Sequence, residues 1–152
     1  MTGEARLRLH HPVPQEIVIE HDAPWEGSGS GYHSIIQDGD LYRMYYKAWN
    51  LTAYLNGNKK IRHYCAYAES DDGIHWRKPN LGLHEFEGST DNNILKASGP
   101  QDGVVLNAAH PAVFKDSNPD AKPEARYKAF FRSDEPLGLM AYQSADGLNW
   151  EP

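Results

Sequence analysis

The segments "SDDGIHW" (Ser70–Trp76) and "SADGLNW" (Ser144–Trp150) decide the fold, because the chain uses one pattern, Ser-x-Asp-Gly-x-x-Trp, twice. The Asp carboxylate of such a pattern can accept hydrogen bonds from the backbone N–H groups of a tight turn, and the Gly tolerates a positive φ. The Ser hydroxyl can close a second local hydrogen bond, and the Trp ring can fill a gap between packed sheets. We therefore predict two equivalent turns whose role is structural rather than catalytic.

Two more matched segments precede each turn, in the same order. "YRMYYK" begins at Tyr42 and "YKAFFR" begins at Tyr127, and both consist of Tyr, a base, any residue, two aromatic residues and a base. Earlier still, "HSII" at His33 matches "HPAV" at His110, and an acidic turn follows each of them. Three matches in one order indicate an internal repeat.

Each repeat predicts four antiparallel strands, the last of them beginning at the Trp of the turn. The loops 51–60 and 117–125, which contain turn-forming residues, explain why the two repeats differ in spacing. Four antiparallel strands in a repeated unit are typical of a β-propeller blade. We expect an arm and lead-in strand over 1–23, a first blade over 24–91 and an incomplete second blade over 92–152.

The composition supports an all-β fold class. The chain has 152 residues, of which 39% are hydrophobic and 24% charged, as in an ordinary globular domain. Nine Tyr, four Trp, 13 Gly and 10 Pro favour strands and turns, and no long stretch has helical periodicity. A net charge of −6 gives no reason to expect nucleic acid or an anionic membrane as a partner.

The single cysteine and the N-terminal sequence limit the disulfides, metal sites and cellular locations that can be expected. Cys65 alone can form neither an internal disulfide nor a cysteine-based zinc site, and its apolar neighbours predict a buried core residue. No apolar stretch approaches the roughly 20 residues that cross a bilayer, and the N-terminus lacks the apolar segment of a secretion signal. We expect a cytoplasmic location for the chain as written, and leave the location open if it is part of a longer protein.

The repeated turn is similar to the Asp-box of sialidases and, more closely, to the turns of five-bladed propellers related to glycoside hydrolase families 32, 43 and 68. Three segments that cover 24–49, 67–95 and 110–131 resemble bacterial proteins of that superfamily that are called family 32-like or 43-like. The resemblance extends from about Pro24 onward. It implies five blades, about two of which are present here. The chain would then be an N-terminal part of a longer protein, or a homo-oligomer that closes its sheets with other copies.

The resemblance implies a pocket at one end of the propeller axis, lined by the starts of the inner strands. Carboxylates from different blades would cleave a glycosidic bond there, one as acid and one as nucleophile or base. By position, the catalytic candidates are Asp22 and Glu26 from the first blade and Asp102 from the second. The alternatives are a turn or cap for Asp22, a solvated side chain for Glu26 and a plain Asp-Gly turn for Asp102.

Three further residues are candidates for substrate binding. Trp25 would either stack on a sugar ring or fill a sheet edge. His33 and His110 occupy equivalent places, where they would donate to sugar hydroxyls, hold a central metal ion, or serve only in packing. No cofactor is indicated. The expected function is a carbohydrate-active, glycoside hydrolase-like propeller; the alternative is a propeller that binds carbohydrate or protein without catalysis, so enzymatic activity stays open.

Some predictions concern residues outside the candidate pocket. The aromatic residues of the repeat should form exposed faces that drive pairing with other copies: Tyr42, Tyr46, Tyr127 and Phe131. Asp91, Asn92 and Asn93 should form a turn between blades, and Lys78 and Lys115 should lie in solvated loops.

Overall fold

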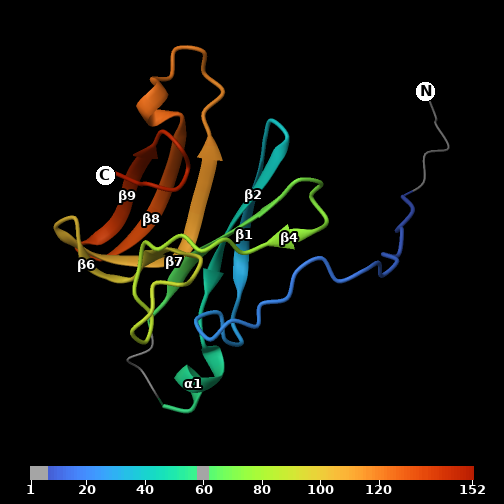
Figure 1. Ribbon diagram of the computed structural model, residues 1–152, viewed down its shortest axis with the longest axis horizontal. Coiled ribbons are helices and arrows are strands. Elements are labelled where there is room, and N and C mark those ends of the chain that lie inside the picture. The colour runs from blue at the N-terminus through green and yellow to red at the C-terminus, as the bar shows by residue number, and fades with distance from the viewer. Residues whose placement is uncertain (1–6, 58–61) are drawn as a thin grey trace.

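A computed structural model describes residues 7–57 and 62–152, so parts of the expected arm (1–6) and of the first loop (58–61) lie outside the described residues (Figure 1). The described chain is all-β with antiparallel pairing, apart from helix α1 (Leu51–Leu55) and a 3₁₀ turn, η1 (Pro123–Ala125). This confirms the prediction of an all-β fold with antiparallel strands. The strands are β1 Gly31–Asp38, β2 Leu41–Ala48, β3 Tyr64–Ser70, β4 Trp76–Arg77, β5 Ile94–Ala97, β6 Gly99–Gln101, β7 Val104–Lys115, β8 Tyr127–Glu135 and β9 Leu137–Ser144.

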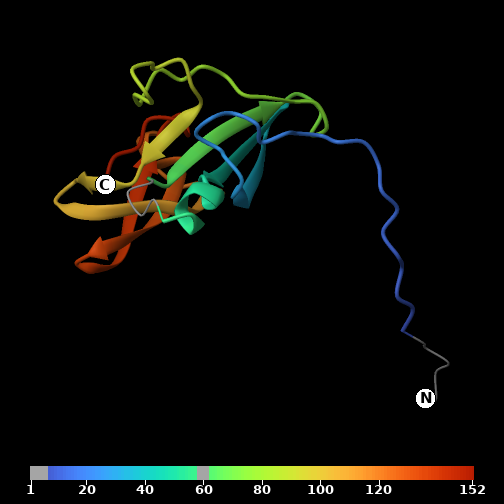
Figure 2. The same cartoon turned by 90° about the horizontal axis from the view of Figure 1, so that it is seen from below.

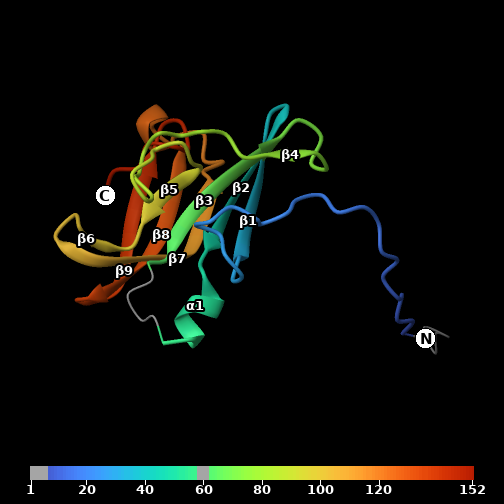
Figure 3. The same ribbon diagram turned by 60° about the horizontal axis from the view of Figure 1, so that its bottom comes forward.

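The first sheet has the order β1-β2-β3-β4, and β5 also pairs with β3. β4 pairs with the end of β3 at Ser70, whereas β5 pairs with its beginning at Tyr64. Both are antiparallel to β3, so together they form one outer edge that the loop 78–93 interrupts (Figure 3). The first repeat is therefore a sheet with a divided fourth strand.

The second sheet has the order β6-β7-β8-β9, and an isolated bridge joins Gln143 of β9 to Glu151. Glu151 follows the Trp of its turn just as Arg77 follows Trp76, and Arg77 pairs with Glu69 in the first sheet. In both repeats the residue after the Trp thus pairs with the residue before the Ser, so the fourth strand of each repeat has the same register.

The two Asp turns have the same hydrogen bonds. The hydroxyl of Ser70 donates to Asp72 Oδ1 at 2.9 Å, and that of Ser144 donates to Asp146 Oδ1 at 3.0 Å. In each turn this Oδ1 also accepts two backbone N–H groups at 2.8 Å. The two glycines have φ values of 78° and 77°, which favour glycine. The prediction of two equivalent turns is confirmed.

The main core lies between the two sheets, where β7 packs against β1, β2 and β3 (Figure 2). Its large buried side chains come from both sheets: Tyr45, Tyr67, Leu106, Phe131 and Tyr142. Cys65 belongs to this core, as predicted. A second cluster on the other face of the first sheet, around Met44 and Tyr46, is covered by Ile19 and Trp25 of the N-terminal segment.

The predicted exposed aromatic faces are assigned to the wrong residues. Tyr46, Tyr127 and Phe131 are buried. The exposed aromatic rings of the second sheet are Phe114 and Phe130, which stack with their centroids 6.4 Å apart. Successive side chains of a strand point to opposite faces. Phe131 is therefore buried while Phe130 is exposed, whereas Tyr45 and Tyr46 are both buried, in clusters on opposite faces of the first sheet.

Asp38, the last residue of β1 before its turn to β2, joins the two sheets. It accepts a hydrogen bond from Arg43 Nε at 2.8 Å in its own sheet, and from Lys115 Nζ and the Tyr127 hydroxyl of the second sheet. Burial opposes its charge, but these partners outweigh burial and lower the pKa of Asp38 to about 2. The prediction that Lys115 is simply solvated is therefore wrong.

Candidate functional site

The segment before β1 is anchored to the first sheet through the carboxylate of Glu26, which is 0% exposed. Its Oε1 accepts a 2.5 Å hydrogen bond from the Tyr46 hydroxyl and lies 3.3 Å from His21 Nδ1. Its Oε2 accepts the Ala23 N–H at 2.9 Å and Lys78 Nζ at 2.7 Å. The solvated alternative for Glu26 is wrong, as is the prediction that Lys78 is a solvated loop residue.

These contacts hold Glu26 in its charged form. Burial raises the pKa of Glu26, but hydrogen bonds from His21, Lys78 and Tyr46 outweigh burial and lower the pKa to about 2. A general acid must carry its proton at the working pH. Glu26 is therefore suited to a permanent carboxylate that positions its neighbours, and not to protonation of a leaving group.

Trp25 and Asn93 belong to the same network. The Trp25 Nε1–H donates to Asn93 Oδ1 at 2.7 Å, and Asn93 Nδ2 donates to the Tyr46 hydroxyl at 2.8 Å. Asn93 also donates to the Tyr67 carbonyl at 2.6 Å and is almost fully buried. Sequence reasoning treats Asn93 as part of a turn and misses this role, because its partners lie 26 to 68 residues away.

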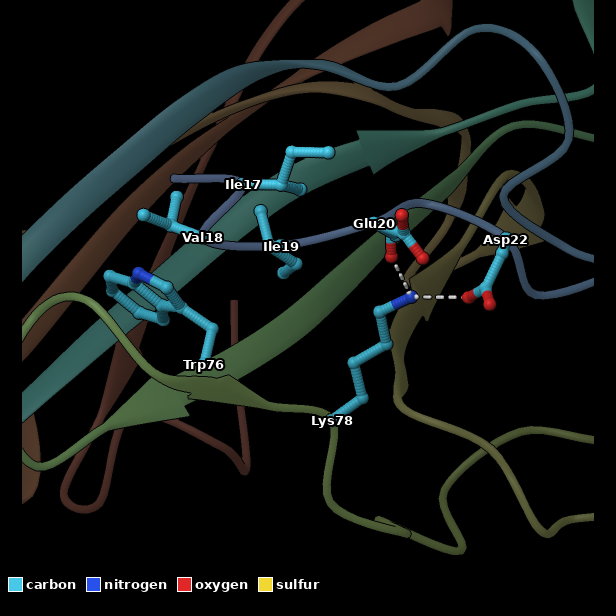
Figure 4. Close-up of a pocket in the computed structure, with 7 residues that line it drawn as sticks. All are labelled: Ile17, Val18, Ile19, Glu20, Asp22, Trp76 and Lys78. Carbon is cyan, nitrogen blue, oxygen red and sulfur yellow. Dashed lines mark hydrogen bonds and ion pairs between the residues drawn. The ribbon is translucent and has the colours of Figure 1, made fainter. Parts of the chain in front are cut away.

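Asp22 lies at the surface, with its side chain 78% exposed, and Lys78 Nζ binds its Oδ1 at 3.1 Å. Figure 4 shows Lys78 reaching Asp22 beside an open depression of about 490 Å³ that Ile17, Ile19 and Trp76 also line. Of the three carboxylates expected to be catalytic, Asp22 is accessible to a ligand in solution and Glu26 is not.

Strands β1 and β7, the first of each repeat, both have a shift of register at their predicted histidine. The register of β1 shifts between Gly31 and Ser34, around His33, and that of β7 shifts between Asn107 and Ala112, around His110. β-Bulges redirect side chains and are frequent next to functional sites. The hydroxyl of Ser34 donates to the Pro111 carbonyl at 3.3 Å, so the two bulges meet.

The two histidines have different partners at this meeting point. His33 Nε2 lies 3.0 Å from His21 Nε2, and its ring stacks on Tyr46. The His110 ring instead meets the Tyr32 ring edge to face, with centroids 4.4 Å apart. His110 also lines an open depression of about 530 Å³ with Arg132. Sequence reasoning misses Tyr32, although its position next to His33 is the signal that would have found it.

Asp102 is placed apart from the other two carboxylates. It lies at the hairpin between β6 and β7 with a φ of 54°, accepts a hydrogen bond from the Tyr142 hydroxyl at 2.7 Å and pairs with Lys96 at 3.6 Å. Within residues 7–57 and 62–152, no contact links Asp102 with Asp22 or Glu26. The structure thus brings Asp22, Trp25, Glu26 and His33 together, and leaves Asp102 separate.

No group of three His, Cys, Asp or Glu side chains among the described residues is arranged to hold a metal ion. No helix in the same part of the chain is long and apolar enough to cross a membrane.

Comparison with known proteins finds uncharacterized mycobacterial relatives. The chain is 30% identical over 120 residues to an uncharacterized protein of Mycobacterium tuberculosis (strain CDC 1551 / Oshkosh). The aligned region covers 78% of this chain and 32% of that protein. The chain is 40% identical over 62 residues to an uncharacterized protein from another strain of the species, covering 41% of this chain and 20% of that protein. The chain therefore spans about a third or less of these relatives. No family model and no solved structure matches it.

Proposed function

We propose that the two sheets are neighbouring blades of a β-propeller and that a saccharide binds where their inner strands meet. We call this surface the inner-strand junction; it is formed by Tyr32, Lys47, Trp49, His63, His110 and Arg132. The equivalent Asp turns and the equal register of both fourth strands support the blade interpretation. The Tyr32–His110 contact between the two repeats supports the place of binding.

The conformation and exposure of Tyr32 are the main support for the saccharide proposal. It has a φ of 54° and yet the residue is 61% exposed, with its ring against His110 of the other sheet. A non-glycine residue at positive φ costs about 1–3 kcal/mol and persists where its surroundings or its function require it. An exposed aromatic ring beside side chains that donate hydrogen bonds offers the two contacts a sugar needs, a flat apolar surface and partners for hydroxyl groups.

Binding is favoured over cleavage for the described residues. Cleavage of a glycosidic bond needs an acid and a second carboxyl group about 5–10 Å apart on either side of it. Glu26 is buried and ionised, and Asp102 contacts Tyr142. Glycoside hydrolysis remains a second candidate, since Asp22 is exposed beside Lys78 at the edge of a depression.

The proposal is tested by screening the protein on an array of neutral and acidic saccharides and measuring the affinity of each ligand by calorimetry. Tyr32→Ala should weaken binding about tenfold or more, because an aromatic contact residue typically accounts for at least 1.4 kcal/mol of affinity. Phe114→Ala removes an exposed ring of the second sheet and should leave the affinity unchanged. An array without a ligand, or equal affinities for Tyr32→Ala and wild type, contradicts the proposal.

Hydrolysis is separated from binding by assays with aryl glycosides. Turnover that Asp22→Asn abolishes while saccharide affinity is kept supports the second candidate. Binding without turnover in the wild type supports the first.

A further inference from the structure

Four basic side chains gather at the inner-strand junction: Lys47 on β2, Arg132 on β8, and the histidines His63 and His110. Lys47 Nζ lies 4.0 Å from the centroid of the Trp49 ring and 5.7 Å from that of Tyr32. The Trp49 ring meets the His63 ring with centroids 4.7 Å apart, as Tyr32 meets His110. The rings of Tyr32 and Trp49 therefore link the bases Lys47, His63 and His110, and Arg132 lies beside His110 at the open depression.

Lys47 has no acidic partner among the described residues, although only 8% of it is exposed. Buried charges are normally paired, because an unpaired ammonium loses its hydration without compensation. Here the aromatic rings give partial compensation through cation–π contacts. The Trp49 Nε1 and the His63 Nε2 are also buried, and neither has a hydrogen-bond partner within residues 7–57 and 62–152. Three polar groups of the junction thus lack the partner that each of them requires.

Lys47 places a positive charge at the junction, in a chain whose net charge is −6. Burial lowers the pKa of His63, and the charge of Lys47 lowers it further; burial, Lys47 and Arg132 do the same to His110. The charge of Asp134 raises the pKa of both histidines. Asp134 is already paired with Arg132, at 2.9 Å. A negative ligand would therefore enter a site that attracts it.

The repeat gives an independent reason to assign these bases a role. In both repeats the first base of the Tyr-base-x-aromatic-aromatic-base pattern pairs with the acid of the preceding turn, Arg43 with Asp38 and Lys128 with Asp116. The last base of the first repeat, Lys47, has no such partner in its sheet. The structure of the sheets and turns thus explains the first base of each pattern, Arg43 or Lys128, but not Lys47.

We propose that the inner-strand junction binds an oxyanion, either the carboxylate or a phosphate or sulfate ester of an acidic saccharide, with the Lys47 ammonium as its central partner and Arg132 and His110 at the rim. Such an anion would supply the partner that Lys47 lacks, and the buried Trp49 N–H would donate a further hydrogen bond. The saccharide part of this inference rests on the proposed function, whereas the anion part rests on Lys47 and its neighbours.

The inference is tested by titrating glucuronic acid, glucose, glucose 6-phosphate and inorganic phosphate into the protein, with binding followed by NMR chemical shifts. Glucuronic acid or glucose 6-phosphate should bind at least about tenfold more tightly than glucose, because one charge-assisted hydrogen bond corresponds to about that factor. Lys47→Met should abolish the preference. Lys122→Met removes the same charge from an exposed loop position and should preserve it.

The outcomes separate this inference from the proposed function. Equal affinities for acidic and neutral sugars overturn the inference of an anion site but agree with the proposed saccharide site. Inorganic phosphate that binds through Lys47 in a protein that binds no sugar supports the anion site and overturns the saccharide proposal. Absence of binding by every anion overturns the inference. A larger affinity for glucuronic acid than for glucose 6-phosphate identifies a carboxylate, and the reverse order identifies a phosphate ester.

Arg132→Gln provides a second variant if Lys47→Met does not fold. Arg132 is half-exposed at the rim, so its replacement leaves the core intact. We expect it to reduce the preference for the acidic sugar about threefold, as loss of a solvent-exposed charge contact does. If Arg132→Gln keeps the full preference, the assignment of the anion to this junction is wrong.

Discussion

Replacing Asp38 by asparagine tests whether one carboxylate holds the two sheets together. Asp38 is 13% exposed and binds Arg43 in its own sheet and Lys115 and Tyr127 in the other. Asn has the same shape and keeps one acceptor oxygen, so Asp38→Asn removes the charge and part of the hydrogen bonding without creating a cavity. The variant therefore measures the contribution of the charge to the contact between the sheets.

The expected loss of stability follows from the pKa of Asp38. A decrease from its ordinary 3.8 to about 2 corresponds to about 2.5 kcal/mol if the whole shift acts on folding. Residual contact with solvent screens part of this interaction. We therefore expect Asp38→Asn to lower the free energy of unfolding by about 2 kcal/mol at pH 7.

Urea unfolding of Asp38→Asn and of Asp40→Asn measures this difference. Asp40 is an exposed carboxylate of the same turn and serves as the matched control. With an m-value of about 2 kcal/mol per molar urea, the midpoint of Asp38→Asn should fall by about 1 M. That of Asp40→Asn should stay within about 0.3 M of the wild type, because exposed substitutions change stability by at most about 0.5 kcal/mol.

The pH dependence gives a second and independent reading. A lowered pKa means that Asp38 stabilises the native state fully above pH 4 and loses this effect as the pH falls toward 2. The stability difference between wild type and Asp38→Asn should shrink over the same range. The reasoning is refuted if Asp38→Asn and Asp40→Asn unfold at the same urea concentration, or if the difference between wild type and Asp38→Asn stays constant from pH 7 to pH 2.

Two further predictions concern the turns and the open face of the second sheet. Asp146→Ala should lower the free energy of unfolding by about 2 kcal/mol, and more than Asp72→Ala, because the second turn also binds the first sheet; equal losses in thermal denaturation would contradict this. We also expect the chain to self-associate through Phe114 and Phe130, which form an exposed apolar surface. Light scattering should then show species larger than a monomer and Phe130→Ser should abolish them, whereas a monomeric wild type at micromolar concentration rules out the association.

The repeat was predictable from the sequence because its turns depend on local chemistry. The Asp and Ser of each turn bond to atoms within three residues, so a short pattern contains the whole interaction. The strands follow from the aromatic pattern, which alternates between two faces. The pattern does not reveal which face another element covers. For that reason Tyr46 and Phe131 were predicted to be exposed, although the N-terminal segment covers the first and the opposite sheet the second.

The candidate site was predictable only in part, because its contacts join residues far apart in the chain. Asp22 and Glu26 could be singled out as acids before an inner strand. Their partner Lys78 lies 52 residues beyond Glu26, in a loop whose local sequence indicates solvent exposure. Asn93 is missed for the same reason. A buried network of this kind depends on how the N-terminal segment packs across the first sheet, and no local pattern contains that information.

The differences between the two repeats are as informative as their agreement. The last base of the repeated pattern is Lys47 in the first repeat and Arg132 in the second. Lys47 is buried between aromatic rings with no acidic partner in the described part of the chain, whereas Arg132 is half-exposed and paired with Asp134. Equivalent positions of a purely structural repeat should make equivalent local contacts, as the two Asp turns do in their internal hydrogen bonds. A single ligand that is bound between two repeats is not itself repeated. The two repeats must therefore contact it with different side chains. The unequal environments of Lys47 and Arg132 therefore favour a ligand site at the inner-strand junction over a role in the sheets alone.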